Sequence, residues 1–229
     1  MSMTQTQPNE ELFRRDRSNR VRTGPFSVVV LCTGNICRSP IAERALRERM
    51  LESEVWPSDL HAQFAVTSAG TGVNSSLVMP EETIAELARL GLPTETRDPV
   101  VLDRDVLDGA DLVLGLTRVH RRSAVKMLPR LSTRAFTLLE FSRVMESLVS
   151  SPPAGLARAY DSGDASGFLR AATERASRRR GVVPPLEDPR AHDIEDPYGR
   201  DQVTFRRVGE RISAAVDTIT EGFAALARE

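Results

Sequence analysis

The sequence predicts an α/β protein built on a four-stranded parallel sheet with flanking helices. Short apolar runs alternate along the chain with segments of helical periodicity, which is the order found in βαβ units. The first run, Phe26–Leu31, is apolar at almost every position, and this favours a central strand covered on both faces. The final segment, Gln202–Arg228, repeats apolar residues at intervals of three and four, which indicates a long amphipathic helix.

The remaining strands are predicted from shorter runs of the same kind. Each run is apolar, contains β-branched or aromatic residues and is bounded by polar or turn-forming residues. The three runs are Phe64–Val66, which leads into Ser68-Ala-Gly-Thr71, then Ala110–Leu114 and Ala135–Leu139.

The helices between these strands have recognisable ends. Ser39-Pro40 begins the first, because serine caps helices and proline suits the first helical position. Pro80–Leu90 is predicted as the second helix and is followed by a glycine, and Thr117–Leu128 as the third, followed by a proline. His120 lies among arginines of the third helix, and we expect it on an exposed face without a functional role.

The two ends of the chain differ in organisation from the middle. Residues 1–24 are polar and charged, which predicts a flexible N-terminal tail ahead of a single domain over residues 25–229. From Ser142 onward the periodicity weakens, while prolines, glycines and arginines accumulate. We interpret residues of about 143–192 as an insertion with mobile parts, in which Gly167–Ser177 is a helical piece.

The residues leave the role of this insertion open between a lid and a surface for a partner. Its arginine run, Arg178-Arg179-Arg180, is expected to be a solvated charge run, with a docking patch for an acidic partner as the alternative.

The composition excludes several function classes. The net charge of -1 lacks the basic excess of a nucleic-acid-binding protein. The longest apolar run, Val28–Cys32, is far shorter than the ~20 residues of a membrane-spanning helix, and the N-terminus lacks the apolar segment of a signal peptide. We therefore expect a cytoplasmic protein without nucleic-acid binding or membrane insertion. Its two cysteines and three histidines do not form a zinc-binding pattern, so no metal or other cofactor is expected, and nothing indicates an oligomeric state.

The chemically informative segment is the loop Cys32-Thr33-Gly34-Asn35-Ile36-Cys37-Arg38-Ser39, between the first strand and the first helix. A loop of this length can curl so that its backbone N–H groups form an anion-binding nest, and the helix N-terminus adds the positive end of its dipole. Gly34 permits backbone angles that other residues resist. Arg38 can bind two oxygens of one phosphate with its planar guanidinium group.

The same positive field favours the thiolate form of Cys32, which is the nucleophilic form of a cysteine. Ser39 is placed to hydrogen-bond this thiolate. The loop is therefore predicted to hold a nucleophile beneath a bound phosphate dianion, and the alternative is a structural cysteine ahead of an ordinary helix cap.

The segment Val30-Leu-Cys-Thr-Gly-Asn-Ile-Cys-Arg-Ser-Pro-Ile-Ala-Glu43 resembles the signature of the low-molecular-weight protein tyrosine phosphatase family. Ser68-Ala-Gly-Thr71, the run from Asp111 to Leu114 and Asp196-Pro-Tyr-Gly199 are consistent with it. The resemblance covers residues 26–142 and 193–228. It implies a three-layer α/β/α fold and a phosphatase that acts on phosphotyrosine in proteins through a phosphocysteine intermediate.

The resemblance also implies a role for each residue of the site. Cys32 is the nucleophile, and Arg38 binds phosphate and stabilises the transition state. Asn35 and Ser39 order the loop and the thiolate, while the backbone from Thr33 to Arg38 cradles the phosphate oxygens. The expected substrate-binding residues are Thr33, Gly34, Asn35, Ile36, Cys37, Ser39 and Tyr198.

Asp196 is the expected general acid, because family members carry that acid in an Asp-Pro-aromatic motif near the C-terminus. The chemistry needs such a group, since the leaving oxygen takes up a proton and a water must later lose one. Asp98 and Asp188 also precede prolines, and both are interpreted as turn formers.

Two residues bear on the substrate. Related protein-arginine phosphatases carry threonine where this chain has Ile36, and an apolar side chain there favours an aryl phosphate. Tyr198 is expected to stack on the substrate ring or, alternatively, to serve in packing only. Gly199 stands where the family often has a second aromatic residue, which leaves the depth of the pocket open.

The sequence leaves two roles open for Cys37, one of them in redox chemistry. In the family such a cysteine can form a reversible disulfide with the nucleophile, and the alternative is a small buried residue. Arsenate reductases that share this loop use two further downstream cysteines, and this chain has none after Cys37. A phosphatase for phosphoarginine or small aryl phosphates, an arsenate-reductase-like thiol protein and a phosphate-binding scaffold remain the alternative functions.

Overall fold

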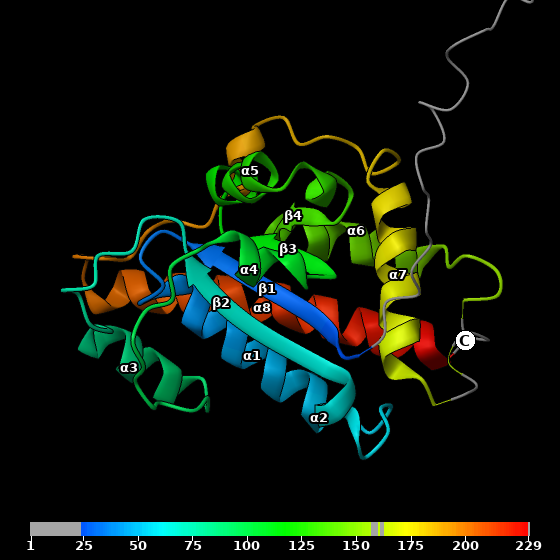
Figure 1. Ribbon diagram of the computed structural model, residues 1–229, viewed down its shortest axis with the longest axis horizontal. Coiled ribbons are helices and arrows are strands. Elements are labelled where there is room, and N and C mark those ends of the chain that lie inside the picture. Colours follow the sequence, from blue (N-terminus) through cyan, green and yellow to red (C-terminus); the bar gives the residue numbers. More distant parts are fainter. Residues whose placement is uncertain (1–23, 157–159, 161–162, 229) are drawn as a thin grey trace, which may run out of the picture.

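The computed structural model describes residues 24–156, 160 and 163–228 (Figure 1). The predicted tail therefore lies, apart from Gly24, outside the described residues. Four parallel strands form one sheet, as predicted, and their order in the sheet is β2-β1-β3-β4. The strands are β1 (Phe26–Cys32), β2 (Phe64–Gly70), β3 (Leu112–Gly115) and β4 (Ala135–Thr137). Over the described ranges, no helix combines the length and apolarity needed to cross a membrane.

Strand β1 is buried on both faces, which explains why it is apolar at every position except Ser27. Val28, Val30 and Cys32 point into a large core on one side of the sheet. Val29 and Leu31 point into a smaller core on the other side. Because side chains alternate along a strand, both sets must be apolar.

Helices cover both faces of the sheet and complete three layers (Figure 1). The larger core lies beneath α1 (Arg38–Glu52), α6 (Leu138–Ser150) and α8 (Gln202–Arg228), and α8 packs against both other helices. The smaller core lies beneath α4 (Arg104–Asp108), α5 (Arg118–Met127) and the 3-10 helix η2 (Pro129–Thr133). Of the remaining helices, α2 (Leu60–Gln63) precedes β2, and α3 (Glu81–Arg89) packs against α8.

Helix α6 begins where the sequence analysis continued a strand. Strand β4 ends at Thr137, whose side chain accepts a hydrogen bond from the Glu140 backbone N–H, while the Glu140 carboxylate accepts one from the Thr137 N–H. This reciprocal capping starts the helix at Leu138. The Thr-x-x-Glu pattern at Thr137 and Glu140 is the sequence signal for this boundary between β4 and α6.

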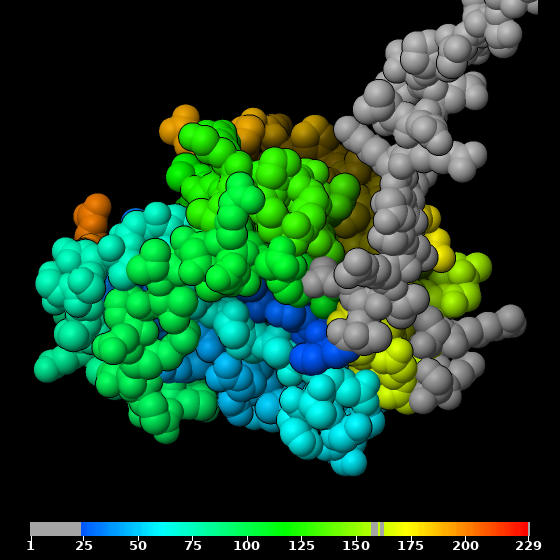
Figure 2. Space-filling view, viewed as in Figure 1, coloured from blue at the N-terminus to red at the C-terminus, as the bar shows by residue number. Residues whose placement is uncertain are grey.

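Beyond α6, the described part of the insertion contains the 3-10 helix η4 (Pro189–His192) and helix α7 (Ala165–Arg179), which lies against the amino ends of β1 and β3. Arg170 donates to the backbone carbonyls of Gly24 and Pro25, just ahead of β1, and pairs with Asp111, just ahead of β3. In Figures 1 and 2, α7 (yellow) lies at the right of the molecule, and residues near 200 (orange) lie at the left, beyond the carboxyl ends of β1 and β2. Helix α7 is therefore not a lid over those carboxyl ends.

The arginine run at the end of α7 is mostly bound to the protein, contrary to the expected solvated run. The Arg179 guanidinium donates to the Ser147 carbonyl at 2.9 Å. The Arg180 guanidinium lies 3.5 Å from the centre of the Phe136 ring and pairs with Glu140. Two of the three arginines thus fasten α7 to the domain.

Candidate active site

The loop from Cys32 to Ser39, which we call the nucleophile loop after the expected role of Cys32, lies where the order of the sheet reverses. Strand β1 has β2 on one side and β3 on the other, and such switch points leave a crevice at the carboxyl ends of parallel strands. Cys32 is the last residue of β1, and residues 33–37 connect it to α1.

The loop is shaped by local backbone geometry. Asn35 has a φ of 58°, the left-handed region that asparagine tolerates better than most residues. A Cβ atom at Gly70 would lie 2.5 Å from the carbonyl oxygen of Thr33, so only glycine allows β2 to end this close to the loop.

The N-terminus of α1 is left free to bind an anion. No side chain caps it at Cys37, and its first turn contains no acidic residue. The first N–H groups of the helix and the positive end of its dipole therefore face the loop, and no side chain of the first turn neutralises them.

The Cys32 thiol lies at the bottom of the site and is only 2% exposed. Its sulfur accepts a hydrogen bond from the Asn35 backbone N–H at 3.2 Å and lies 3.0 Å from the Ser39 hydroxyl. Asn35 also donates to Ser39 through its side-chain amide at 3.0 Å. The structure thus brings these three predicted residues together.

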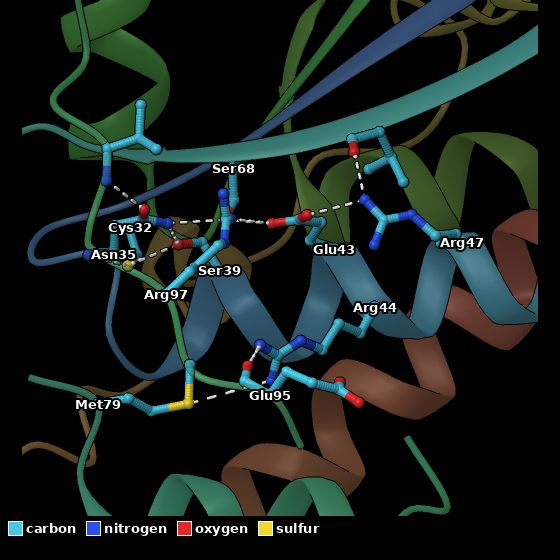
Figure 3. Close-up of polar contacts among 12 residues, drawn as sticks. Cys32, Asn35, Ser39, Glu43, Arg44, Arg47, Ser68, Met79, Glu95 and Arg97 are labelled. Atoms are coloured by element: carbon cyan, nitrogen blue, oxygen red, sulfur yellow. Dashed lines mark hydrogen bonds and ion pairs between the residues drawn. The ribbon is translucent and has the colours of Figure 1, made fainter. Parts of the chain in front are cut away.

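A buried polar chain continues from Asn35 away from the pocket (Figure 3). The Asn35 amide donates to Ser68 at 2.7 Å, and Ser68 donates to the Glu43 carboxylate at 2.6 Å. Glu43 pairs with both Arg97 and Arg47. The sequence analysis did not identify Glu43 or Arg97 as part of the site, because their side chains meet only through tertiary structure.

The chain of bonds fixes the direction of the hydroxyl hydrogen nearest the nucleophile. The Glu43 carboxylate accepts only, so Ser68 gives it its hydrogen. Ser68 and Ser39 each then accept one of the two Asn35 amide hydrogens. The Ser39 hydroxyl hydrogen is left for the Cys32 sulfur, where it stabilises negative charge.

Arg38 is buried behind the loop, with its guanidinium at the pocket. It donates to the Ile194 carbonyl at 3.1 Å and to Asp196 at 2.5 Å. Its Nε atom is buried without a hydrogen-bond partner among the described residues. A buried guanidinium N–H without a partner is costly, and a phosphate oxygen in the pocket would satisfy it.

Asp196 reaches the pocket from the loop ahead of α8. Its side chain is half exposed, and its second oxygen accepts from the Tyr198 backbone N–H at 3.3 Å. The competing Asp188 instead caps the 3-10 helix η4 (Pro189–His192), as a turn former does. Asp98 is exposed and does not line the pocket.

The pocket gathers most, not all, of the expected substrate-binding residues. Asn35 and Ser39 are not among its lining residues and contact the Cys32 sulfur and each other behind the loop, as expected for residues that order it. The sequence analysis missed three lining residues. The full lining consists of Cys32, Thr33, Gly34, Ile36, Cys37, Arg38, Gly72, Asn74, Leu77, Asp196 and Tyr198.

Cys37 lies in this lining but is buried, and both cysteines are free thiols. Burial raises the pKa of Cys37 to about 12, and the nearby Cys32 adds to the shift. Cys37 is therefore a neutral thiol near pH 7, unlike a nucleophilic cysteine.

His120 is buried beside the loop rather than exposed, which corrects the expectation for the third helix. It is 4% exposed, and its ring contacts Thr33 and Thr117. Burial lowers the pKa of His120 from 6.5 to about 4; the charge of Arg38 lowers it further, and the charges of Asp196 and Asp193 oppose the shift. The ring is neutral at pH 7. No local pattern in the sequence distinguishes it from the exposed arginines around it.

This shift predicts a pH dependence of stability. Below pH 6.5 the unfolded chain protonates His120, whereas the folded chain does so only near pH 4, so acid favours unfolding. The free energy of unfolding of the wild type should fall by roughly 3 kcal/mol more than that of His120→Gln between pH 7 and pH 4. Urea unfolding of both proteins across this range measures the difference. Equal changes in the free energy of unfolding of the two proteins over this pH range would contradict the low pKa assigned to His120.

Within the described ranges, no three His, Cys, Asp or Glu side chains gather as a metal site requires.

Comparisons with known proteins agree with this geometry. A model of the low molecular weight phosphotyrosine protein phosphatase family matches residues 27–160, a segment that ends before Asp196. A protein-arginine-phosphatase of Geobacillus stearothermophilus is 27% identical over 137 residues, which are 59% of this chain and 84% of that protein. A low molecular weight protein-tyrosine-phosphatase of Staphylococcus saprophyticus is 30% identical over 128 residues, 56% of this chain and 78% of that protein.

Solved structures share the fold. A low molecular weight protein tyrosine phosphatase from T. tengcongensis superposes with a TM-score of 0.57 and 24% identity, over 86% of this chain and 98% of that one. An arginine phosphatase from Geobacillus stearothermophilus gives a TM-score of 0.56 and 21% identity, over 86% of this chain and 92% of that one.

Proposed function

Because the chain belongs to the low molecular weight phosphotyrosine protein phosphatase family, a family of hydrolases, we propose that it removes phosphate from tyrosine side chains of proteins through a phosphocysteine intermediate. Cys32 is the nucleophile, Arg38 holds the phosphate, and Asp196 exchanges the proton. The reaction uses side chains and backbone N–H groups of this chain and no cofactor.

In the first step the Cys32 sulfur attacks phosphorus, and the bond from phosphorus to the tyrosine oxygen breaks. The electron pair of that bond leaves with the oxygen, which takes a proton from Asp196. Arg38 and the N–H groups of the loop hold the remaining phosphate oxygens throughout, so the developing charge stays paired.

In the second step a water attacks the phosphocysteine and gives its proton to the Asp196 carboxylate. The phosphorus–sulfur bond breaks, and Cys32 leaves as a thiolate that receives the Ser39 hydroxyl hydrogen bond. Inorganic phosphate is released. One carboxyl group therefore serves as acid and then as base.

The observation that carries this proposal is the environment of Arg38. Its Nε has no hydrogen-bond partner in the described part of the chain, and its guanidinium and Asp196 line the same pocket as the buried Cys32. A phosphate monoester has the groups that this arrangement lacks: oxygens for the guanidinium and a phosphorus atom above the sulfur.

The pocket walls favour an aryl phosphate over a phosphoguanidine. Ile36 is apolar and 5% exposed, and offers no hydrogen bond to guanidinium nitrogens. Leu77 and Tyr198 form further apolar lining, and the half-exposed Tyr198 ring lies at the rim, where it can stack on a phenyl ring. The protein-arginine-phosphatase relative supports phosphoarginine as the second candidate substrate.

A direct comparison of substrates tests the proposal. The purified chain, reduced and with EDTA present, should hydrolyse p-nitrophenyl phosphate. Its kcat/KM for a phosphotyrosine peptide should exceed that for the matched phosphoarginine peptide by at least about tenfold, because a buried guanidine left without a partner is penalised. Ile36→Thr should lower the ratio of kcat/KM for the phosphotyrosine peptide to kcat/KM for the phosphoarginine peptide. A preference for phosphoarginine would favour the second candidate, and inactivity on every ester would refute both.

A further inference from the structure

His120 connects the start of α5 to the nucleophile loop. Its Nδ1 atom lies 3.0 Å from the Thr117 hydroxyl oxygen, and its Nε2 atom lies 3.1 Å from the Thr33 hydroxyl oxygen. Thr33 lines the pocket directly after the nucleophile, whereas His120 does not reach the pocket. The imidazole is thus a bridge between a helix cap and a side chain that faces the substrate.

The helix cap determines which ring nitrogen carries the proton. The Thr117 hydroxyl oxygen caps α5 by accepting from the His120 backbone N–H at 3.4 Å. Of the two groups that the Thr117 hydroxyl contacts, the backbone N–H can only donate, so the hydroxyl hydrogen finds an acceptor here only if His120 Nδ1 carries no hydrogen. A neutral ring with an acceptor at Nδ1 carries its hydrogen at Nε2, and that hydrogen is donated to Thr33.

The Thr33 hydroxyl oxygen has a second donor. Arg38 Nη2 lies 3.5 Å from it, and the same nitrogen donates to Asp196 at 2.5 Å. With both lone pairs of its oxygen directed to His120 and Arg38, the hydroxyl must direct its own hydrogen elsewhere. Because Thr33 lines the pocket, an oxygen of a bound phosphate is an acceptor within reach of this hydrogen.

We propose that His120 is a positioning residue that orients the Thr33 hydroxyl as a hydrogen-bond donor to a phosphoryl oxygen of the bound phosphate monoester, on the Asp196 side of the pocket. This inference rests on the proposed function. It adds a side-chain donor to Arg38 and the loop N–H groups. The buried, neutral state of the ring agrees with it, because a protonated ring would donate from both nitrogens and could not accept the Thr117 hydroxyl hydrogen.

A double-mutant cycle on p-nitrophenyl phosphate tests whether His120 acts through Thr33. His120→Leu and Thr33→Val should each lower kcat/KM by about tenfold, the effect of one hydrogen bond to a charged group. The double variant should be no worse than either single variant, because both remove the same bond. Independent losses that multiply, or full activity of His120→Leu, would overturn the proposal.

Conservative variants separate positioning from folding. His120→Gln places an amide N–H near the former Nε2 and should recover part of the lost kcat/KM, and Thr33→Ser keeps the hydroxyl and should do the same. Val119→Ala, at an exposed neighbour on α5, is the matched control and should behave as the wild type. Equal losses in His120→Leu and His120→Gln would overturn the proposal.

Two further measurements do not depend on turnover. The ¹⁵N chemical shifts of the wild-type His120 ring should identify the Nε2–H tautomer, and the Nδ1–H tautomer would refute the assignment. Binding of inorganic phosphate, measured by calorimetry, should weaken about tenfold in His120→Leu and in Thr33→Val. If both variants bind phosphate about tenfold more weakly than the wild type, but the wild type hydrolyses no ester, the proposed function fails and the positioning role stands.

Discussion

Cys32→Ser should abolish turnover while leaving the phosphate site intact. A hydroxyl is a poor nucleophile without an adjacent base, and the neighbours of Cys32 are donors: the Asn35 N–H and the Ser39 hydroxyl. Loss of a nucleophile costs on the order of 10⁴–10⁶-fold in kcat. We therefore expect no measurable hydrolysis of p-nitrophenyl phosphate by the variant. The detection limit of the assay is the activity of the wild type at a ten-thousandfold dilution.

Binding distinguishes a dead site from a misfolded one. Serine has nearly the shape of cysteine, so the loop and Arg38 should keep their positions. Calorimetric titration with inorganic phosphate should show binding close to that of the wild type, because Arg38 and the loop N–H groups are unchanged. Residual turnover above one part in a thousand would assign the nucleophile to another residue.

Asp196→Asn should slow turnover by about 10²–10⁴-fold, the usual contribution of a general acid. Asparagine keeps the shape of the side chain and its contact with the Tyr198 N–H, but has no carboxyl proton to give. The loss should be larger for a phosphotyrosine peptide than for p-nitrophenyl phosphate, because p-nitrophenolate leaves more readily without protonation. Steady-state kinetics with both substrates measures the two losses.

Asp188→Asn is the matched control for this prediction. Asp188 also precedes a proline, but it lies outside the pocket and caps a 3-10 helix. Its substitution should change kcat by less than about twofold, since asparagine also caps well. If Asp188→Asn slows the reaction as much as Asp196→Asn, the acid has been assigned to the wrong aspartate.

Sequence reasoning predicted those features whose cause is local. An almost entirely apolar run identifies β1, because a strand that is buried on both faces needs apolar side chains at successive positions. The Cys32–Ser39 loop is contiguous, so its nucleophile and arginine are visible together, and the family resemblance that it carries is confirmed. The long helix at 202–228 follows from its periodicity alone and has the predicted bounds.

The features that were missed depend on distant parts of the chain. His120 looks like its exposed neighbours in sequence, and only the packing of α5 beside the loop buries it. Glu43 is separated from Ser68 by 25 residues and from Arg97 by 54, so no spacing rule connects them. The insertion has no catalytic pattern, and its position at the amino ends of the strands follows from contacts such as that of Arg170 with Gly24.

The ion pair between Arg38 and Asp196 has a consequence for product release. The Arg38 guanidinium and the Asp196 carboxylate are held 2.5 Å apart, so Asp196 competes with any anion for the guanidinium. If the proposed function holds, the same carboxylate competes with the product phosphate and repels it by its charge. We therefore expect this ion pair to weaken product inhibition by inorganic phosphate.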